Sequence, residues 1–270
     1  MKKTGKILRI ILACIATVGL IVSAANIIIY FVQGAKAKEN QQQTLQSYVT
    51  QETTTGAQQG TEVIRPDGAA SAAMPDVEAL RYQVNFEKLQ AVNPEVCGWI
   101  MVCALPTVNF PMVWCGDDTS YLHKGWEGEY NWYGAIFVEG MNYPDFLDRH
   151  TIVYGHNMMD GSMFGTLEQF KEQDFFKNNS RYIVVHIPGH TMLYEIFSVE
   201  YGDAYDDNIY RIAFSDTQEM DAFVSGMKER SLYDTGIDAS GSDKILTVST
   251  CAYIFDGARF VLHAKQVWKS

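Results

Sequence analysis

The chain has 270 residues, which is enough for one or two domains. It is 47% hydrophobic and 20% charged, and this composition excludes a collagen, a coiled coil, a disulfide-dense miniprotein and a wholly disordered chain. The net charge of −11 argues against a nucleic-acid-binding protein. The charge is unevenly distributed, because residues 1–38 contain six basic residues and no acidic one. This asymmetry indicates a membrane or targeting segment at the N-terminus.

Residues 10–32 form a run of 23 residues without a charge. A helix of that length crosses a hydrocarbon core of about 30 Å, whereas the apolar part of a cleaved signal peptide has roughly 7–15 residues. We therefore predict a cytoplasmic N-terminus at 1–9 and a transmembrane anchor at 10–32, with a cleaved signal as the alternative. More basic residues precede the run than follow it, which favours an extracytoplasmic location for the rest of the chain.

Residues 33–75 are rich in Gln, Thr and Ala and contain few bulky apolar side chains. Such a segment cannot offset the conformational entropy that it loses on ordering. We therefore predict a flexible extracytoplasmic linker at 33–75 and a single folded domain at 76–270.

The folded domain is predicted to be mainly β, in the α+β class. Eight short β-type runs with Gly and Pro between them indicate a closed or nearly closed barrel. The runs lie at 98–103, 107–114, 134–138, 151–154, 181–187, 192–201, 244–250 and 259–267.

Three helices are predicted around these strands. The first starts at Asp76 and ends before Asn93, which precedes a proline. The second lies near 163–170. The third begins at a capping box at 215–218, continues with apolar residues at helical spacing, and falls between the sixth and seventh strands.

Cys251 and Arg259 are the first pair of residues that could carry chemistry. Cys251 ends the seventh strand, where its thiol would lie at the mouth of a barrel, and a hairpin would bring Arg259 close to it. A guanidinium beside a thiol lowers the thiol pKa and can donate hydrogen bonds to an oxyanion. Taken singly, the two residues are also consistent with a buried free cysteine and a surface arginine.

His156 follows the strand at 151–154 in a Gly-His-Asn loop, which would expose its imidazole for proton transfer. The sequence contains no P-loop, EF-hand loop, dinucleotide fingerprint or zinc-ligand spacing, so neither a metal nor an organic cofactor is predicted. Whether Cys97 and Cys103 form a disulfide stays open.

Several segments resemble motifs of the sortases, the membrane-anchored cysteine transpeptidases of Gram-positive bacteria, and they occur in the same order along the chain as in that family. The residues that end at Cys251 resemble the TLxTC strand, the loop around His156 resembles the sortase histidine loop, and the strand from Arg259 resembles the class B form RFVVHAK. The resemblance extends over about 76–267, and the helix predicted after 215 also favours class B. Further similar segments lie at 93–100, 108–113 and 160–164.

The resemblance implies an eight-stranded sortase barrel with peripheral helices. It implies two-step acyl transfer with Cys251 as nucleophile, His156 as general acid and base, and Arg259 as stabiliser of the oxyanion. One departure is Ala252, because some class B members have an acidic residue there. The implied substrate-binding residues are Ser249, Thr250 and Asn157.

The implied partners are secreted proteins with a C-terminal sorting signal, cut after Thr, and a peptidoglycan amine from lipid II or a cross-bridge. The implied location is the cell membrane, crossed once, with the catalytic domain outside. Two other readings remain, a hydrolytic cysteine peptidase and a non-catalytic tethered binding module. Papain-like enzymes place Cys before His within CGSCW, and here His156 precedes Cys251. Within the family, wall anchoring is favoured over pilin polymerisation because no second apolar span is seen. The sorting motif, the accepting amine and the client proteins are not specified by the sequence.

Overall fold

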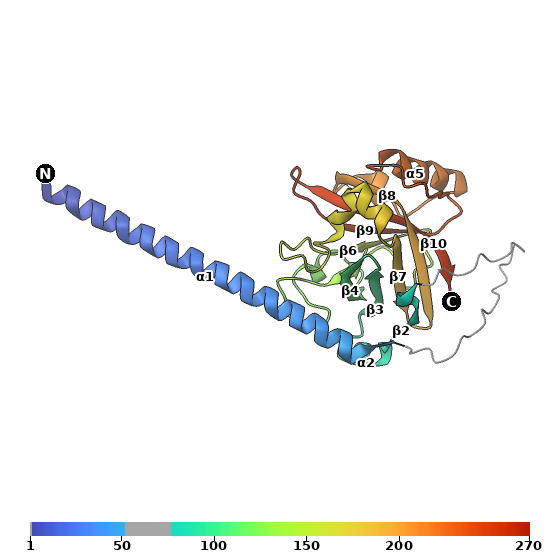
Figure 1. Cartoon of the computed structure of the whole chain (residues 1–270), viewed down its shortest axis with the longest axis horizontal. Coiled ribbons are helices and arrows are strands. Elements are labelled where there is room, and N and C mark those ends of the chain that lie inside the picture. The colour runs from blue at the N-terminus through green and yellow to red at the C-terminus, as the bar shows by residue number, and fades with distance from the viewer. Residues whose placement is uncertain (1, 52–76) are drawn as a thin grey trace, which may run out of the picture. The chain divides into compact units, whose positions relative to one another are not determined.

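The computed structural model describes residues 2–51 and 77–270, and the chain divides into two compact units at residues 43 and 44. The first unit consists of most of helix α1 (Lys2–Tyr48) (Figure 1). From Leu12 onward this helix is long and apolar enough to cross a membrane, with a mean hydropathy of 2.4 over its most apolar window. By its length and composition, the helix is consistent with a membrane anchor.

The linker predicted for 33–75 is wrong over residues 33–48, because α1 continues to Tyr48. Gln, Ala, Glu and Lys dominate this stretch, and these residues have high intrinsic helix propensity. Residues 49–51 form a short strand, β1 (Val49–Gln51). The rest of the predicted linker, 52–75, lies outside the described residues.

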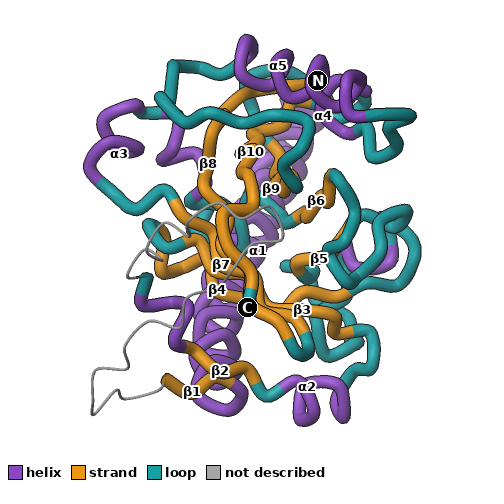
Figure 2. Tube along the Cα trace, turned by 90° about the vertical axis from the view of Figure 1, so that its right-hand side faces the viewer, coloured by secondary structure: helices purple, strands orange, loops and turns teal. Residues whose placement is uncertain are grey.

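The second unit contains a closed barrel of eight strands, as predicted (Figure 2). Around the barrel the order is β10-β8-β7-β3-β4-β5-β6-β9, and every neighbouring pair is antiparallel except β4–β5 and β6–β9. Each strand matches one of the predicted runs to within a few residues. The strands are β3 (Val96–Val102), β4 (Leu105–Val113), β5 (Ile136–Val138), β6 (His150–Tyr154), β7 (Tyr182–Ile187), β8 (His190–Asp203), β9 (Ile245–Cys251) and β10 (Ala258–Lys269).

The helix predicted between Asp76 and Asn93 is wrong as a single element, and Asp76 itself lies outside the described residues. The chain instead forms a 3₁₀ turn, a short strand that pairs with β1, and an α-helix capped by Asn85, whose side chain accepts from the Lys88 N–H at 2.9 Å. The pairing with β1 is a long-range contact that outweighs the local helical spacing. The elements are η1 (Glu78–Arg81), β2 (Tyr82–Val84) and α2 (Phe86–Val92).

The helix predicted near 163–170 is replaced by a 3₁₀ turn, η3 (Leu167–Lys171), and a helix, α3 (Gln173–Asn178). Met163 adopts a φ of 52°, a left-handed conformation that cannot continue a right-handed helix. Two further short elements are η2 (Ser120–Leu122) and α4 (Asp207–Tyr210).

Helix α5 (Thr217–Arg230) lies between the sixth and seventh barrel strands, as predicted, and packs against β8 (Figure 2). Its cap lies one residue later than predicted: Asp216 accepts from the Glu219 N–H, and Glu219 accepts from the Ser215 N–H. The predicted apolar face is buried against Phe197 and Ile245. The buried residues of this face are Met220, Phe223, Val224 and Met227.

A buried polar chain links four strands beneath the β9–β10 hairpin. The His150 Nδ1–H donates to the Arg211 carbonyl at 2.6 Å, and His150 Nε2 lies 2.6 Å from the Thr247 hydroxyl. Thr247 in turn lies 2.8 Å from His263 Nδ1, and His263 Nε2 lies 2.7 Å from Glu200. Burial, together with the charge of His263, lowers the pKa of His150 to about 3. His150 is therefore neutral at pH 7, and its Nε2 accepts a hydrogen bond from the Thr247 hydroxyl.

Candidate active site

The β9–β10 hairpin brings Cys251 and Arg259 together. Cys251 is the last residue of β9 and lies opposite Arg259 in the antiparallel register. Directly opposed residues of an antiparallel pair project to the same face of the sheet. Both residues line a cleft of about 500 Å³, and the guanidinium is held by the Gly257 and Ala258 carbonyls, which accept from Nη1 at 3.3 and 3.1 Å. The predicted placement of the two groups is therefore found.

The loop after β6 places His156 in the same cleft. Gly155 makes this possible because it packs closely against the end of β9. Its carbonyl accepts from the Thr250 hydroxyl at 2.7 Å, and its N–H donates to the backbone of β9. A Cβ at this position would lie 2.6 Å from the Phe164 ring, so any larger residue would displace the loop.

A backbone carbonyl fixes the proton on the His156 ring. Nε2 lies 2.7 Å from the Leu122 carbonyl oxygen, which can only accept a hydrogen bond. Nε2 therefore carries a proton, and Nδ1 is the nitrogen left for proton exchange. Gly134 permits this contact: its φ is +62°, and a Cβ there would lie 2.7 Å from the Leu122 oxygen and 3.1 Å from His156 Cδ2.

The three residues predicted to bind substrate have internal partners. Ser249 and Thr250 line the cleft, but both are buried, and the Ser249 hydroxyl lies 2.9 Å from the hydroxyl of Tyr210. Asn157 donates from its amide to the Cys251 carbonyl at 2.7 Å. These contacts hold the ends of the strand and of the histidine loop together, and substrate binding by the three residues stays a prediction.

The chain is similar to known proteins in both sequence and structure. Residues 109–267 match the sortase domain family. The chain belongs to the sortase family. It is 32% identical to sortase B of Listeria monocytogenes over 188 residues, which is 68% of this chain and 75% of the relative. The structure of Clostridium perfringens sortase B superposes with a TM-score of 0.63 and 34% identity, covering 67% of this chain and 98% of that one. A Staphylococcus aureus sortase B–substrate complex superposes with a TM-score of 0.62 and 27% identity, covering 67% and 84%.

These similarities place the chain in class B of the sortases, which are cysteine transpeptidases. Helix α5 agrees with the class B expectation from the sequence.

One wall of the sortase cleft is acidic, although no sequence motif indicates it. Asp118 and Glu139 both line the cleft, and the hydroxyl of Tyr154 donates to Glu139 at 2.7 Å. Burial, and then the neighbouring Asp118, raise the pKa of Glu139. Both carboxylates lie outside the predicted motifs, in loops brought together only by the barrel.

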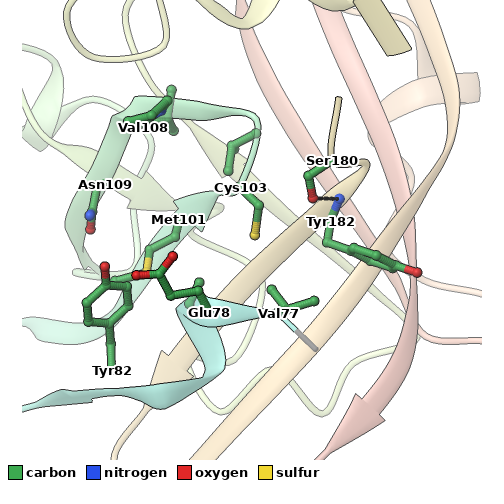
Figure 3. Close-up of a pocket in the computed structure, with 12 residues that line it drawn as sticks. Val77, Glu78, Tyr82, Met101, Cys103, Val108, Asn109, Ser180 and Tyr182 are labelled. Carbon is green, nitrogen blue, oxygen red and sulfur yellow. Dashed lines mark hydrogen bonds between the residues drawn. The ribbon is translucent and has the colours of Figure 1, made fainter. Parts of the chain in front are cut away.

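Two further cysteines of the barrel domain, Cys97 and Cys103, lie away from the cleft. A second cavity of about 440 Å³ is lined by Cys103 and Ser180 together with residues of η1, β2, β3 and β4 (Figure 3). Burial raises the pKa of Cys103 to about 11 and that of Cys97 to about 12, so both thiols stay protonated at neutral pH. Both are free cysteines in the structure, with no disulfide between them. Over residues 2–51 and 77–270, no group of three or more His, Cys, Asp or Glu side chains could hold a metal ion.

Proposed function

We propose that this sortase cleaves a C-terminal sorting signal after Thr and joins the new carboxyl group to a peptidoglycan amine. The observation that carries the proposal is the shared cleft. The cleft is lined by Cys251 and Arg259, which are paired across one hairpin, and by His156. The Leu122 carbonyl binds His156 Nε2, so Nδ1 is the nitrogen available for proton transfer. Thiol, imidazole and guanidinium are the three groups that acyl transfer through a thioester needs.

In the first half-reaction the Cys251 thiol transfers its proton to His156 Nδ1, and Sγ attacks the carbonyl carbon of the Thr residue. The C–N bond breaks, and the leaving amine takes a proton from His156 Nδ1. Arg259 stabilises the tetrahedral oxyanion with its guanidinium N–H donors. The product is a thioester between Cys251 and the N-terminal part of the substrate.

In the second half-reaction an amine of lipid II or of a peptidoglycan cross-bridge attacks the thioester carbon. His156 Nδ1 takes the proton of the attacking amine, the C–S bond breaks, and the thiolate of Cys251 leaves. An amide bond joins the two partners, and no proton is gained or lost over the whole cycle. The chemistry requires neither a metal nor an organic cofactor.

The proposed location is the cell membrane. Residues 10–32 would cross the bilayer, residues 1–9 would be cytoplasmic, and the catalytic domain at 76–270 would lie outside. The apolar length of α1 and the basic residues that precede residues 10–32 support this topology. Both proposed substrates would then be on the same side of the membrane as the cleft.

The test uses the full chain in detergent micelles, as wild type and as Cys251→Ala. Each is incubated with a panel of sorting peptides and an amine nucleophile, and the products are identified by mass spectrometry. Cleavage after Thr with transfer to the amine, lost in Cys251→Ala, is the expected result. Hydrolysis without transfer to any amine would instead identify a peptidase, and the absence of a Cys251 adduct with every peptide would favour a binding module.

A further inference from the structure

The segment from η2 to Gly134 contacts His156 in more than one way. Its Leu122 carbonyl accepts from Nε2, as described above. The next residue, His123, places its imidazole beside that of His156, with ring centroids 5.9 Å apart and planes at 18°. The hydrogen bond fixes one ring nitrogen, and a parallel neighbour fixes the plane of the ring.

His123 is the middle ring of a stack of three. Its other face lies against Trp132, with centroids 5.2 Å apart and planes at 15°. These distances fall within the range of about 4.5–7 Å in which aromatic rings attract one another. Trp132 is 51% exposed and His123 is exposed as well, so the two rings contribute little to the core. Instead, Trp132 contacts His123, and His123 contacts His156.

Hydrogen bonds hold the backbone on both sides of His123, and they fix the position from which its ring projects. The Asp117 carboxylate accepts from the N–H groups of Thr119 and Ser120 at 2.8 and 2.7 Å, which fixes the start of the turn. The buried Tyr121 hydroxyl accepts from the Asn93 amide at 2.8 Å. The carbonyl of His123 itself accepts from the Asn131 N–H at 3.0 Å, one residue before Trp132.

We propose that His123 is a positioning residue for His156, with Trp132 supporting its outer face. The inference rests on the proposed role of His156 as general acid and base. Rotation of the His156 ring would break both the Leu122 hydrogen bond and the stack, so Nδ1 is kept in one orientation.

The kinetic test compares His123→Ala, His123→Phe and Trp132→Ala in the full chain with the wild type. An aromatic pair contributes about 0.5–1.5 kcal/mol, and about 1.36 kcal/mol corresponds to tenfold in rate. His123→Ala should therefore lower kcat about 2- to 13-fold and leave KM within about twofold. His123→Phe keeps a stacking ring and should retain most of the activity, whereas Trp132→Ala should show a smaller loss than His123→Ala.

A second measurement needs no substrate. In full chain labelled at its six histidines, the ring protons of His156 are identified by their loss in His156→Gln and followed by NMR. The ring current of a stacked neighbour shifts them upfield, so His123→Ala should move them downfield and His123→Phe should not. Unchanged His156 resonances in His123→Ala, or an equal loss of kcat in the Phe and Ala variants, would overturn the proposal. If the wild type turned over no peptide, the proposed function would fail, while the resonances would still report on the stack.

Discussion

Replacing His150 with Gln should reduce the acid sensitivity of the barrel. The pKa of His150 is about 3 in the folded state, lowered by burial and by the charge of His263, against about 6.5 in an unfolded chain. Between these two values the unfolded state binds a proton that the folded state does not, so the free energy of unfolding falls as the pH falls. At up to about 1.36 kcal/mol per pH unit, lowering the pH from 6.5 to 4.5 removes about 2 kcal/mol through this one residue.

The assay is urea unfolding of the full chain in detergent micelles, followed by tryptophan fluorescence at several pH values. Glutamine keeps one donor toward the Arg211 carbonyl and one acceptor toward Thr247, but it does not titrate. The free energy of unfolding of His150→Gln should therefore vary less with pH. Its slope between pH 6.5 and 4.5 should correspond to about one proton fewer taken up on unfolding than in the wild type, whatever its stability at pH 7. An identical pH dependence in the two proteins would refute the reasoning.

Three further changes have defined outcomes. Gly134→Ala should lower kcat at least about tenfold, because its Cβ would displace the Leu122 carbonyl and the His156 ring. Gly189→Ala is the matched control: its φ is also positive, at +85°, but the space around it is open, and it should keep activity. Asn157→Asp, which loses the amide donor to the Cys251 carbonyl, should lower kcat about 5- to 150-fold with the fold retained by circular dichroism. Arg230→Ala should lower the free energy of unfolding by about 3 kcal/mol in urea titrations, because the buried carboxylate of Glu200 on β8 loses its bidentate ion pair. An unchanged urea midpoint would contradict this.

The barrel could be predicted from the sequence because its strands are marked locally. β-branched and aromatic residues alternate in short runs with Gly and Pro between them, and the order of the motifs placed Cys251 and Arg259 on one hairpin. Gly155 and His156 were likewise visible as a loop that follows a strand. Their close approach to β9, however, required the packing of the Phe164 ring to be known.

The parts that the sequence did not predict depend on distant contacts. Val77, Leu80 and Val84 have helical spacing, yet Tyr82–Val84 form a strand because β1, more than thirty residues earlier, pairs with them. The ring stack on His156 joins residues that share no motif, and the carbonyl that fixes its proton belongs to Leu122, whose side chain carries no signal. Such groups are recognised only once the barrel has brought them together.

The most direct test of the account is the mass of the enzyme during a single turnover. Full chain is mixed with excess sorting peptide in the absence of an amine, quenched in acid and measured intact, and the modified residue is located by proteolysis. The account predicts an adduct equal to the peptide fragment that ends in Thr, attached at Cys251 and released by hydroxylamine as expected for a thioester. An adduct on another residue, or peptide cleavage by Cys251→Ala, would contradict it.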